Sequence, residues 1–194
     1  MADITSLCVY CGSSGRVRQS HKDAARELGE RLARSGIRLV YGGGRVGLMG
    51  IAADAALANG GEVAGVIPKF LEALEVGHTE CTEFHVTDNM HDRKLKMATL
   101  SDAFAVLPGG LGTLDETFEI LTWKQLGLHD KPIVLVDVDG FWTPLSNLIE
   151  AQIEENYIRA EHRDLYRIAP TVADVLPTIR SMPSARFSLE SKWL

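Results

Sequence analysis

The residues best placed for chemistry stand at a glycine-rich turn, Pro108-Gly109-Gly110-Leu111-Gly112-Thr113. The apolar run 103–107 before it predicts a short strand, and the helical apolar spacing from Thr113 predicts a helix. Free N–H groups and a threonine hydroxyl at a helix start form a usual phosphate site. Two acids, Asp115 and Glu116, are expected in the first turn of this helix, where they would repel a phosphate. A carboxylate there therefore needs another role.

Two further glycine-rich turns follow predicted strands. The turn 11–15 follows the strand 4–10, and the turn 42–50 follows the strand 37–41. In an open parallel sheet, the turns at the carboxyl ends of the strands gather along one edge, where ligands bind. Three such turns favour an anionic ligand. The candidate phosphate or pocket-wall residues in the first two turns are Gly12, Ser13, Gly43 and Gly44.

A basic pair, Arg93-Lys94, stands near the start of a helix predicted over 89–100. Most such pairs are solvated, but this one is expected near the same edge of the sheet. The guanidinium of Arg93 offers a planar fork that suits a phosphate, a carboxylate or the edge of a base.

The other motifs in the sequence give weaker indications of a function. Gly42-x-Gly44-x-x-Gly47 matches the dinucleotide fingerprint, but it follows the second strand and lacks the later acid that would hold a ribose. These glycines could instead serve only close packing of strand and helix. The sequence has no Walker phosphate loop, no zinc-binding His-Glu-x-x-His and no Gly-x-Ser-x-Gly elbow, so we expect neither a metal nor a cofactor. Cys8 and Cys11, three apart on a strand, should face opposite sides of the sheet and form a poor redox pair.

The bulk properties fit one globular domain. At 194 residues we expect a single nucleotide-binding catalytic domain over 1–180 and a loose tail over 181–194. The net charge of −6 argues against a nucleic-acid-binding surface. No apolar run approaches the roughly 20 residues that span a bilayer, so no membrane partner is expected. Three cysteines cannot form a disulfide framework, which favours a reducing, cytoplasmic location.

Strands and helices alternate along the chain, which predicts an α/β fold: a Rossmann-like, doubly wound parallel sheet with helices on both faces. Further strands are expected at 63–67, 84–86 and 133–138. Residues 69–88 are otherwise expected to be less regular. The remaining expected helices are 20–35, a segment that ends at 58, 144–155 and 171–179.

Three blocks together, at 42–50, 90–94 and 108–116, closely resemble the Lonely Guy (LOG) family of cytokinin riboside 5′-monophosphate phosphoribohydrolases, sometimes mislabelled lysine decarboxylases. The likeness runs from Cys11 to Pro132. It implies a homodimeric Rossmann-like enzyme without a metal. Such an enzyme hydrolyses the N-glycosidic bond of an adenine-type nucleoside 5′-monophosphate, releasing free base and ribose 5-phosphate.

The resemblance also assigns residues. The catalytic pair falls on Arg93 and Glu116. This chain has Asp115-Glu116 where many members have two glutamates, but the catalytic position is the second. Glu75 lies where the likeness is loosest. The implied substrate contacts are Glu75, Arg93, Lys94, Gly110, Leu111, Gly112, Thr113, Leu114, Asp115, Glu116 and Thr122.

We therefore expect the turn amides to hold the 5′-phosphate and Glu116 to face the ribose, which becomes cationic as the bond breaks. Three alternatives stay open: a general AMP nucleosidase, a nucleotide or cofactor carrier without chemistry, and a pyridoxal-dependent lysine decarboxylase, for which no Schiff-base lysine stands out. One apolar set could form a dimer surface or serve core packing. It comprises Leu121, Trp123, Leu126, Phe141 and Trp142.

Overall fold

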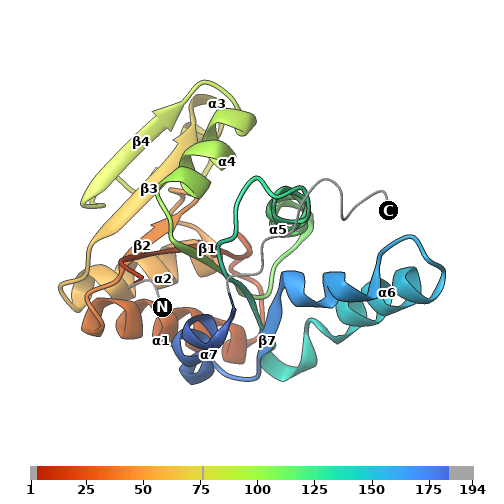
Figure 1. Ribbon diagram of the computed structural model, residues 1–194. Helices are drawn as coiled ribbons and strands as arrows, with labels where there is room; N and C mark the ends of the chain where they lie inside the picture. The colour runs from red at the N-terminus through yellow and green to blue at the C-terminus, as the bar shows by residue number, and fades with distance from the viewer. Residues whose placement is uncertain (1–3, 76, 184–194) are drawn as a thin grey trace.

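A seven-stranded sheet in the order β4-β3-β2-β1-β5-β6-β7 forms the centre of the computed structural model, and every neighbouring pair of strands is parallel (Figure 1). The structure describes residues 4–75 and 77–183, without the side chains of 73–75. The strands are β1 (Ser6–Tyr10), β2 (Arg38–Tyr41), β3 (Val63–Pro68), β4 (Glu83–Thr87), β5 (Ala103–Val106), β6 (Ile133–Val136) and β7 (Arg167–Ala169). The predicted α/β fold is confirmed.

The order of the strands reverses between β1 and β5, because the chain first builds outward from β1 to β4 and then returns to the other side of β1. Such a switch point leaves a crevice at the carboxyl ends of the two strands. The glycine turns after β1 and β5 meet there, since the Gly12 N–H donates to the carbonyl of Pro108 at 3.1 Å.

Helices cover both faces of the sheet (Figure 1). α1 (Gln19–Arg34), α2 (Gly47–Ala58) and α7 (Val175–Ser181) pack on one face. α4 (Met90–Thr99), α5 (Leu111–Gln125) and α6 (Thr143–Glu154) pack on the other, and α3 (Lys69–Glu75) follows β3. Short 3₁₀ turns, η1 (Val138–Gly140), η2 (Ala160–Leu165) and η3 (Val172–Asp174), connect the last elements.

The strands read as unbroken apolar runs because both of their faces are buried. In β1, Leu7 and Val9 join the core under α1 and α2, whereas Cys8 and Tyr10 join the core under α4 and α5. Cys11 lies on the first side, so Cys8 and Cys11 face opposite sides of the sheet, as predicted.

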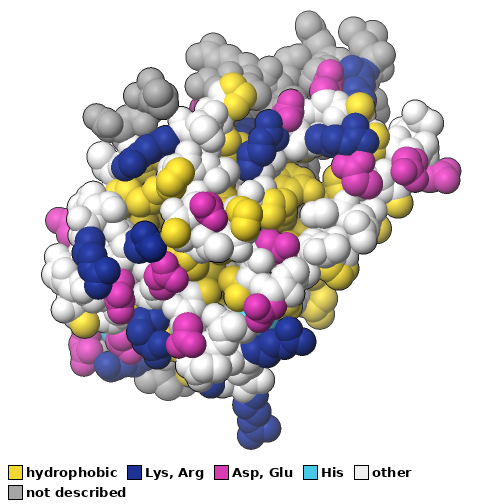
Figure 2. All heavy atoms as spheres, turned by 90° about the horizontal axis from the view of Figure 1, so that it is seen from below, with side chains coloured by type: hydrophobic (Ala, Val, Ile, Leu, Met, Phe, Trp, Pro, Cys, Tyr) yellow, Lys and Arg dark blue, Asp and Glu magenta, His cyan; other side chains and the backbone are white. Residues whose placement is uncertain are grey.

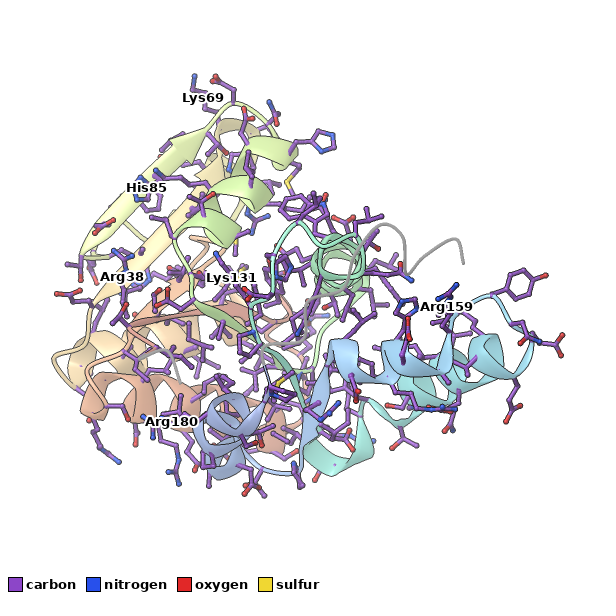
Figure 3. The ribbon with its side chains drawn as sticks, in the orientation of Figure 1. Arg38, Lys69, His85, Lys131, Arg159 and Arg180 are labelled. Carbon is purple, nitrogen blue, oxygen red and sulfur yellow. The ribbon has the colours of Figure 1, made fainter. Side chains whose placement is uncertain are left out.

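Polar contacts at the amino edge align the strands. The Asp102 carboxylate accepts four hydrogen bonds, from the N–H and the hydroxyl of both Thr5 and Ser6, at 2.9–3.0 Å. They hold the start of β1 beside the start of β5, with Leu7 opposite Ala103. Arg38 opens β2 and pairs with Glu83 of β4 at 3.0 Å (Figure 3).

Several predicted boundaries were wrong. Residues 69–75, expected to be irregular, form α3, and β7 was missed, since elements of seven and three residues are too short to show a period. The last helix begins at Val175 instead of 171, because Thr171 and Asp174 form a capping box around a 3₁₀ turn first. Of the tail predicted over 181–194, residues 184–194 lie outside the described part.

Figure 2 views the molecule from below, and positive and negative side chains are interspersed on this face. On α1 they pair within the helix, Arg26 with Asp23 at 2.8 Å, Arg31 with Glu27 at 2.7 Å and Arg34 with Glu30 at 3.0 Å. A face of mixed sign does not attract nucleic acid as a basic patch does. Among the described residues, no helix combines the length and the apolar character needed to cross a membrane.

Candidate active site

A cavity of about 190 Å³ lies at the switch point, between the ends of β1 and β5 and the starts of α2, α4 and α5. Its position is the sheet edge at which the sequence predicts a ligand. The residues that line it are Cys11, Gly12, Ser13, Met49, Met90, Arg93, Gly110, Leu111, Gly112, Thr113 and Glu116.

One wall of the cavity is the start of α5, which begins at Leu111 and not at Thr113 as expected. Gly110 is the N-cap with extended backbone angles, and the first helical bond runs from Leu114 N–H to Gly110 C=O at 3.0 Å. The first turn holds no acid, so the prediction that Asp115 and Glu116 stand there was wrong. The helix N-terminus is therefore free of fixed negative charge and can receive an anion.

The glycines of this turn differ in their roles. A Cβ on Gly109 would come within 2.1 Å of the Thr113 hydroxyl, so this glycine allows Thr113 to pack against the turn. A Cβ on Gly110 or Gly112 would meet no atom within 4 Å. The backbone at these two positions thus borders open space, where a ligand can approach the amides.

Arg93 is held by the ends of two strands. Its Nε donates to the carbonyl of Val66 at 3.1 Å, and its Nη2 donates to the carbonyl of Gly42 at 3.2 Å. A Cβ on Gly42 would lie 2.1 Å from Nη2, so a glycine is needed for the guanidinium to reach this place. Only 6% of Arg93 is exposed. Its charge is therefore fixed in position before any ligand binds.

Glu116 faces this guanidinium across the cavity, with 3.7 Å between Glu116 Oε1 and Arg93 Nη2. It is 8% exposed and lies one turn inside α5. Burial first, and then the charge of Glu116, raises the pKa of the neighbouring Cys11 thiol well above its ordinary value. A protonated thiol is not a nucleophile, so Cys11 is not prepared to attack a ligand. Because the start of α5 carries no acid and the Glu116 carboxylate lies beside it, the arrangement can hold an anion on the turn amides and stabilise a cation beside Glu116.

Known proteins are similar to this chain in sequence or in fold. A family model described as "possible lysine decarboxylase" matches residues 49–179. The cytokinin riboside 5′-monophosphate phosphoribohydrolase LOG of Oryza sativa subsp. japonica is 45% identical over 170 residues, which cover 88% of this chain and 70% of that protein. LOG4 of Arabidopsis thaliana, of the same description, is 42% identical over 186 residues, covering 96% and 86%.

The chain belongs to the LOG family. Among solved structures, the Moco carrier protein of Chlamydomonas reinhardtii matches with a TM-score of 0.70 and 22% identity, over 93% of this chain and 98% of that one. The molybdenum cofactor binding protein of Rippkaea orientalis matches with a TM-score of 0.69 and 22% identity, over the same shares. These two likenesses support the fold alone.

The residues that the LOG resemblance assigns do not all reach the cavity. Arg93, Glu116 and the run from Gly110 to Thr113 line it, as do Gly12 and Ser13. The side chain of Glu75 lies outside what the structure describes. The residues assigned by the resemblance that lie away from the cavity lining are Lys94, Leu114, Asp115 and Thr122. Gly43 and Gly44, predicted from the glycine turns as pocket-wall residues, do not line it either.

Three cavity residues had no assigned role in the sequence analysis: Cys11, Met49 and Met90. Each belongs to a segment that the sequence analysis recognised: Cys11 opens the turn after β1, and Met49 and Met90 lie in the first turns of α2 and α4. The rule that ligands bind where strands end and helices begin could have identified them. Among the described residues, no group of three or more His, Cys, Asp or Glu could hold a metal ion, and the expected absence of a metal stays a prediction.

Lys94 joins α4 to α5. Its Nζ lies 3.1 Å from Asp115 Oδ2 and 3.0 Å from Glu119 Oε1, and its side chain is 8% exposed. Burial alone would lower the pKa of Lys94, but Glu119 and Asp115 raise it above the ordinary value. The ammonium is therefore already engaged by two carboxylates of the helix that carries Glu116.

We expect Lys94→Met to lower the free energy of unfolding by about 1–2 kcal/mol, a value reduced because Asp115 is exposed. Turnover should fall about tenfold through misplacement of Glu116, with little change in the dissociation constant of AMP. Thermal denaturation, kinetics and calorimetry measure the three quantities. A direct role in substrate binding gives the opposite result: weaker AMP binding with unchanged stability.

Proposed function

We propose that this LOG-family enzyme hydrolyses the N-glycosidic bond of adenine-type, cytokinin nucleoside 5′-monophosphates, releasing free base and ribose 5-phosphate. The observation that carries the proposal is the buried pair of Arg93 and Glu116, 3.7 Å apart, in the same cavity as the acid-free start of α5. The start of α5 suits the phosphate, and the pair of Arg93 and Glu116 suits the sugar. The two relatives described above are named for this reaction.

In the proposed mechanism, the amides of Gly110, Gly112 and Thr113 bind the 5′-phosphate. This leaves the ribose beside Glu116, one helical turn further in. As the bond from C1′ to the base nitrogen breaks, its electron pair leaves with the base and the ribose becomes cationic. The carboxylate of Glu116 stabilises that cation and orients the water that attacks C1′. The proton that this water loses ends on the nitrogen of the departing base, which is released neutral. Arg93 fixes the carboxylate through the contact at 3.7 Å.

The substrate experiment compares AMP with prenylated AMP. Met49, Met90 and Leu111 give the cavity an apolar part, so we expect a higher kcat/KM for the prenylated nucleotide. An added apolar group of one to a few carbons is worth roughly 10–200-fold. Chromatography of the free base measures both rates. A preference for AMP would favour a general AMP nucleosidase, and no release of base from either nucleotide would favour a carrier.

The lysine decarboxylase description gains little support. Burial lowers the pKa of Lys124 to about 8, as a Schiff-base lysine requires. However, Lys124 is not among the residues that line the cavity of Arg93 and Glu116. The absence of pyridoxal absorbance in the purified protein is the expected result.

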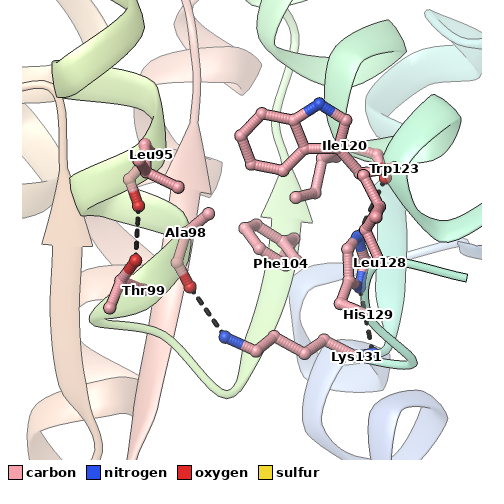
Figure 4. Close-up of a pocket in the computed structure, with 9 residues that line it drawn as sticks. All are labelled: Leu95, Ala98, Thr99, Phe104, Ile120, Trp123, Leu128, His129 and Lys131. Atoms are coloured by element: carbon pink, nitrogen blue, oxygen red, sulfur yellow. Dashed lines mark hydrogen bonds between the residues drawn. The ribbon is translucent and has the colours of Figure 1, made fainter.

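We also propose a homodimer formed through α4 and α5. A hollow of about 300 Å³ lies between these helices and is lined by Leu95, Phe104, Ile120, Trp123 and Leu128, among others (Figure 4). Leu95 and Leu128 lie on opposite sides of this hollow (Figure 4) and are 55% and 68% exposed, so both sides present an apolar side chain to the surface. Leu121 and Trp142, considered for the same surface, are instead core residues.

The exposed face of α5 adds a second reason for the dimer. Leu111 lines the active-site cavity and is 86% exposed, and Phe118 and Thr122 follow on the same helix face. A second copy on this face would bring Thr122 of one subunit towards the other subunit's cavity, which accounts for the substrate role assigned to it.

We expect Leu95→Asp with Leu128→Asp to convert a dimer into a monomer, measured by light scattering after gel filtration. The matched control is Leu148→Asp on α6, a leucine that is 49% exposed and lies outside this surface. A monomeric wild-type protein, or a dimer that survives both substitutions, contradicts the proposed interface.

We also propose a cytoplasmic location, which the free thiols of Cys8, Cys11 and Cys81 support because free thiols persist in a reducing compartment.

A further inference from the structure

A second cavity, of about 450 Å³, lies on the other side of the glycine turns from the candidate active site. Gly12, Ser13 and Gly110 line both cavities. The second one is bounded by the loop before α1, by the start of α1 and by Phe141 after η1. Nothing in the proposed hydrolysis uses it.

Two arginines of this cavity, Arg16 and Arg18, form no ion pair within the described chain. The other described arginines, Arg180 excepted, each lie within 4 Å of an acid. They are Arg26, Arg31, Arg34, Arg38, Arg45, Arg93, Arg159, Arg163 and Arg167. In a protein with a net charge of −6, two guanidinium groups that line one cavity and pair with no described carboxylate are available for an external anion.

The start of α1 also favours a negatively charged ligand in this cavity. This helix has 16 residues, no side chain caps its N-terminus, and its first turn contains no acid. Its first helical bond, from Lys22 N–H to Arg18 C=O, is long at 3.4 Å. The uncapped amides and the helix dipole favour an anion at this end.

His21 supplies an observation that is independent of the arginines and of the helix start. It lines the cavity and is 6% exposed, and its Nε2 has no hydrogen-bond partner in the described chain. A buried polar atom without a partner is costly and calls for an explanation. Its ring lies edge-on to Phe141, with 5.5 Å between centroids, so the polar side of the cavity adjoins an apolar wall.

One acid lies nearby, Asp139 of η1. Its carboxylate accepts a hydrogen bond from the Ser20 hydroxyl at 2.6 Å, which ties η1 to α1. Asp139 is not among the residues that line the cavity, whereas Arg16, Arg18 and His21 are. The charge inside the cavity is therefore positive.

We propose that this cavity is a second anion site, which binds a phosphomonoester while a nucleotide occupies the active site. The arginines, the start of α1 and His21 receive the phosphate, and Phe141 receives the organic part. Two ligands carry the phosphate group: the ribose 5-phosphate that the proposed reaction releases, which is a phosphomonoester, and inorganic phosphate, which lacks the organic part.

The test titrates ribose 5-phosphate, and separately inorganic phosphate, into the Glu116→Gln protein that holds one equivalent of AMP per subunit. AMP also carries a phosphomonoester, so a larger amount would compete for the second cavity. We expect one further anion per subunit to bind in calorimetry, because one AMP in the active site leaves the second cavity open. Tighter binding of ribose 5-phosphate supports the role of Phe141, and equal binding overturns that role. No binding of either anion to the protein with one AMP would overturn the proposal.

The variant Arg16→Ala with Arg18→Ala should weaken this second binding about 10–100-fold, as expected for the loss of hydrogen bonds from charged groups. In the otherwise wild-type protein, the same variant should keep its AMP turnover within about twofold, since it removes no contact to Arg93 or Glu116. Arg180→Ala is the matched control, an arginine that also forms no ion pair with a described residue but lies on α7 (Figure 3). Equal loss of AMP turnover and of anion binding would place the two arginines in the nucleotide site and overturn a separate one. If the double alanine variant does not fold, Arg16→Gln with Arg18→Gln replaces it.

Discussion

Glu116→Gln is expected to lower the turnover of a nucleoside 5′-monophosphate about 10²–10⁴-fold, the usual effect of losing an acid–base group. The amide keeps the size of the side chain but removes the negative charge that would stabilise the cationic ribose. The nearly isosteric amide keeps the packing of a side chain that is only 8% exposed, but it leaves the buried Arg93 without its carboxylate, so the protein should fold with a lowered melting temperature.

The dissociation constant of AMP should change little in this variant, since the phosphate is assigned to the amides at the start of α5. Kinetics gives the loss in kcat, and calorimetry gives the dissociation constant. Glu27→Gln on α1 is the matched control, because it also removes one carboxylate charge, but from an exposed pair with Arg31. Turnover near that of the wild type in a folded Glu116→Gln protein would rule out the catalytic role.

Arg93→Ala is expected to reduce turnover by a similar factor, about 10²–10⁴-fold, and also to destabilise the fold. The guanidinium satisfies the carbonyls of Val66 and Gly42 and lies beside Glu116, all in a buried setting. Removing a buried charged donor of this kind costs about 2–4 kcal/mol in the free energy of unfolding. Denaturant unfolding and steady-state kinetics measure the two effects.

Arg93→Lys separates the two roles of this arginine. Lysine keeps the positive charge but has no planar fork, so it cannot reproduce the donation to two carbonyls together with the contact to Glu116. We expect it to recover part of the stability while turnover stays low, because Glu116 is no longer fixed. If Arg93→Ala loses stability but retains turnover, Arg93 holds the ends of β2 and β3 together and does not serve the reaction.

Local sequence patterns were enough to predict the fold class and the family of this protein. The alternation of apolar runs with helical spacing predicted the parallel α/β sheet, and the blocks at 42–50, 90–94 and 108–116 predicted the family. They succeeded because a buried parallel strand and a glycine turn each leave a signal within a few neighbouring residues. The same patterns placed the start of α5 two residues late, since glycines at 110 and 112 hide a helix start from apolar spacing.

The geometry of the site depends on contacts between residues far apart in the sequence. Arg93 meets Glu116 because α4 and α5 lie on the same face of the sheet, and it stays there because the ends of β2 and β3 accept its hydrogen bonds. The neighbouring Lys94 turns instead to Asp115 and Glu119, and Thr122 faces outward, although the LOG resemblance assigns both to the substrate. Apart from the short elements α3 and β7, the sequence by itself determined which elements form and which chemical groups they carry. Only the packing of those elements around the switch point decided which groups meet, because such long-range contacts leave no periodic trace along the chain.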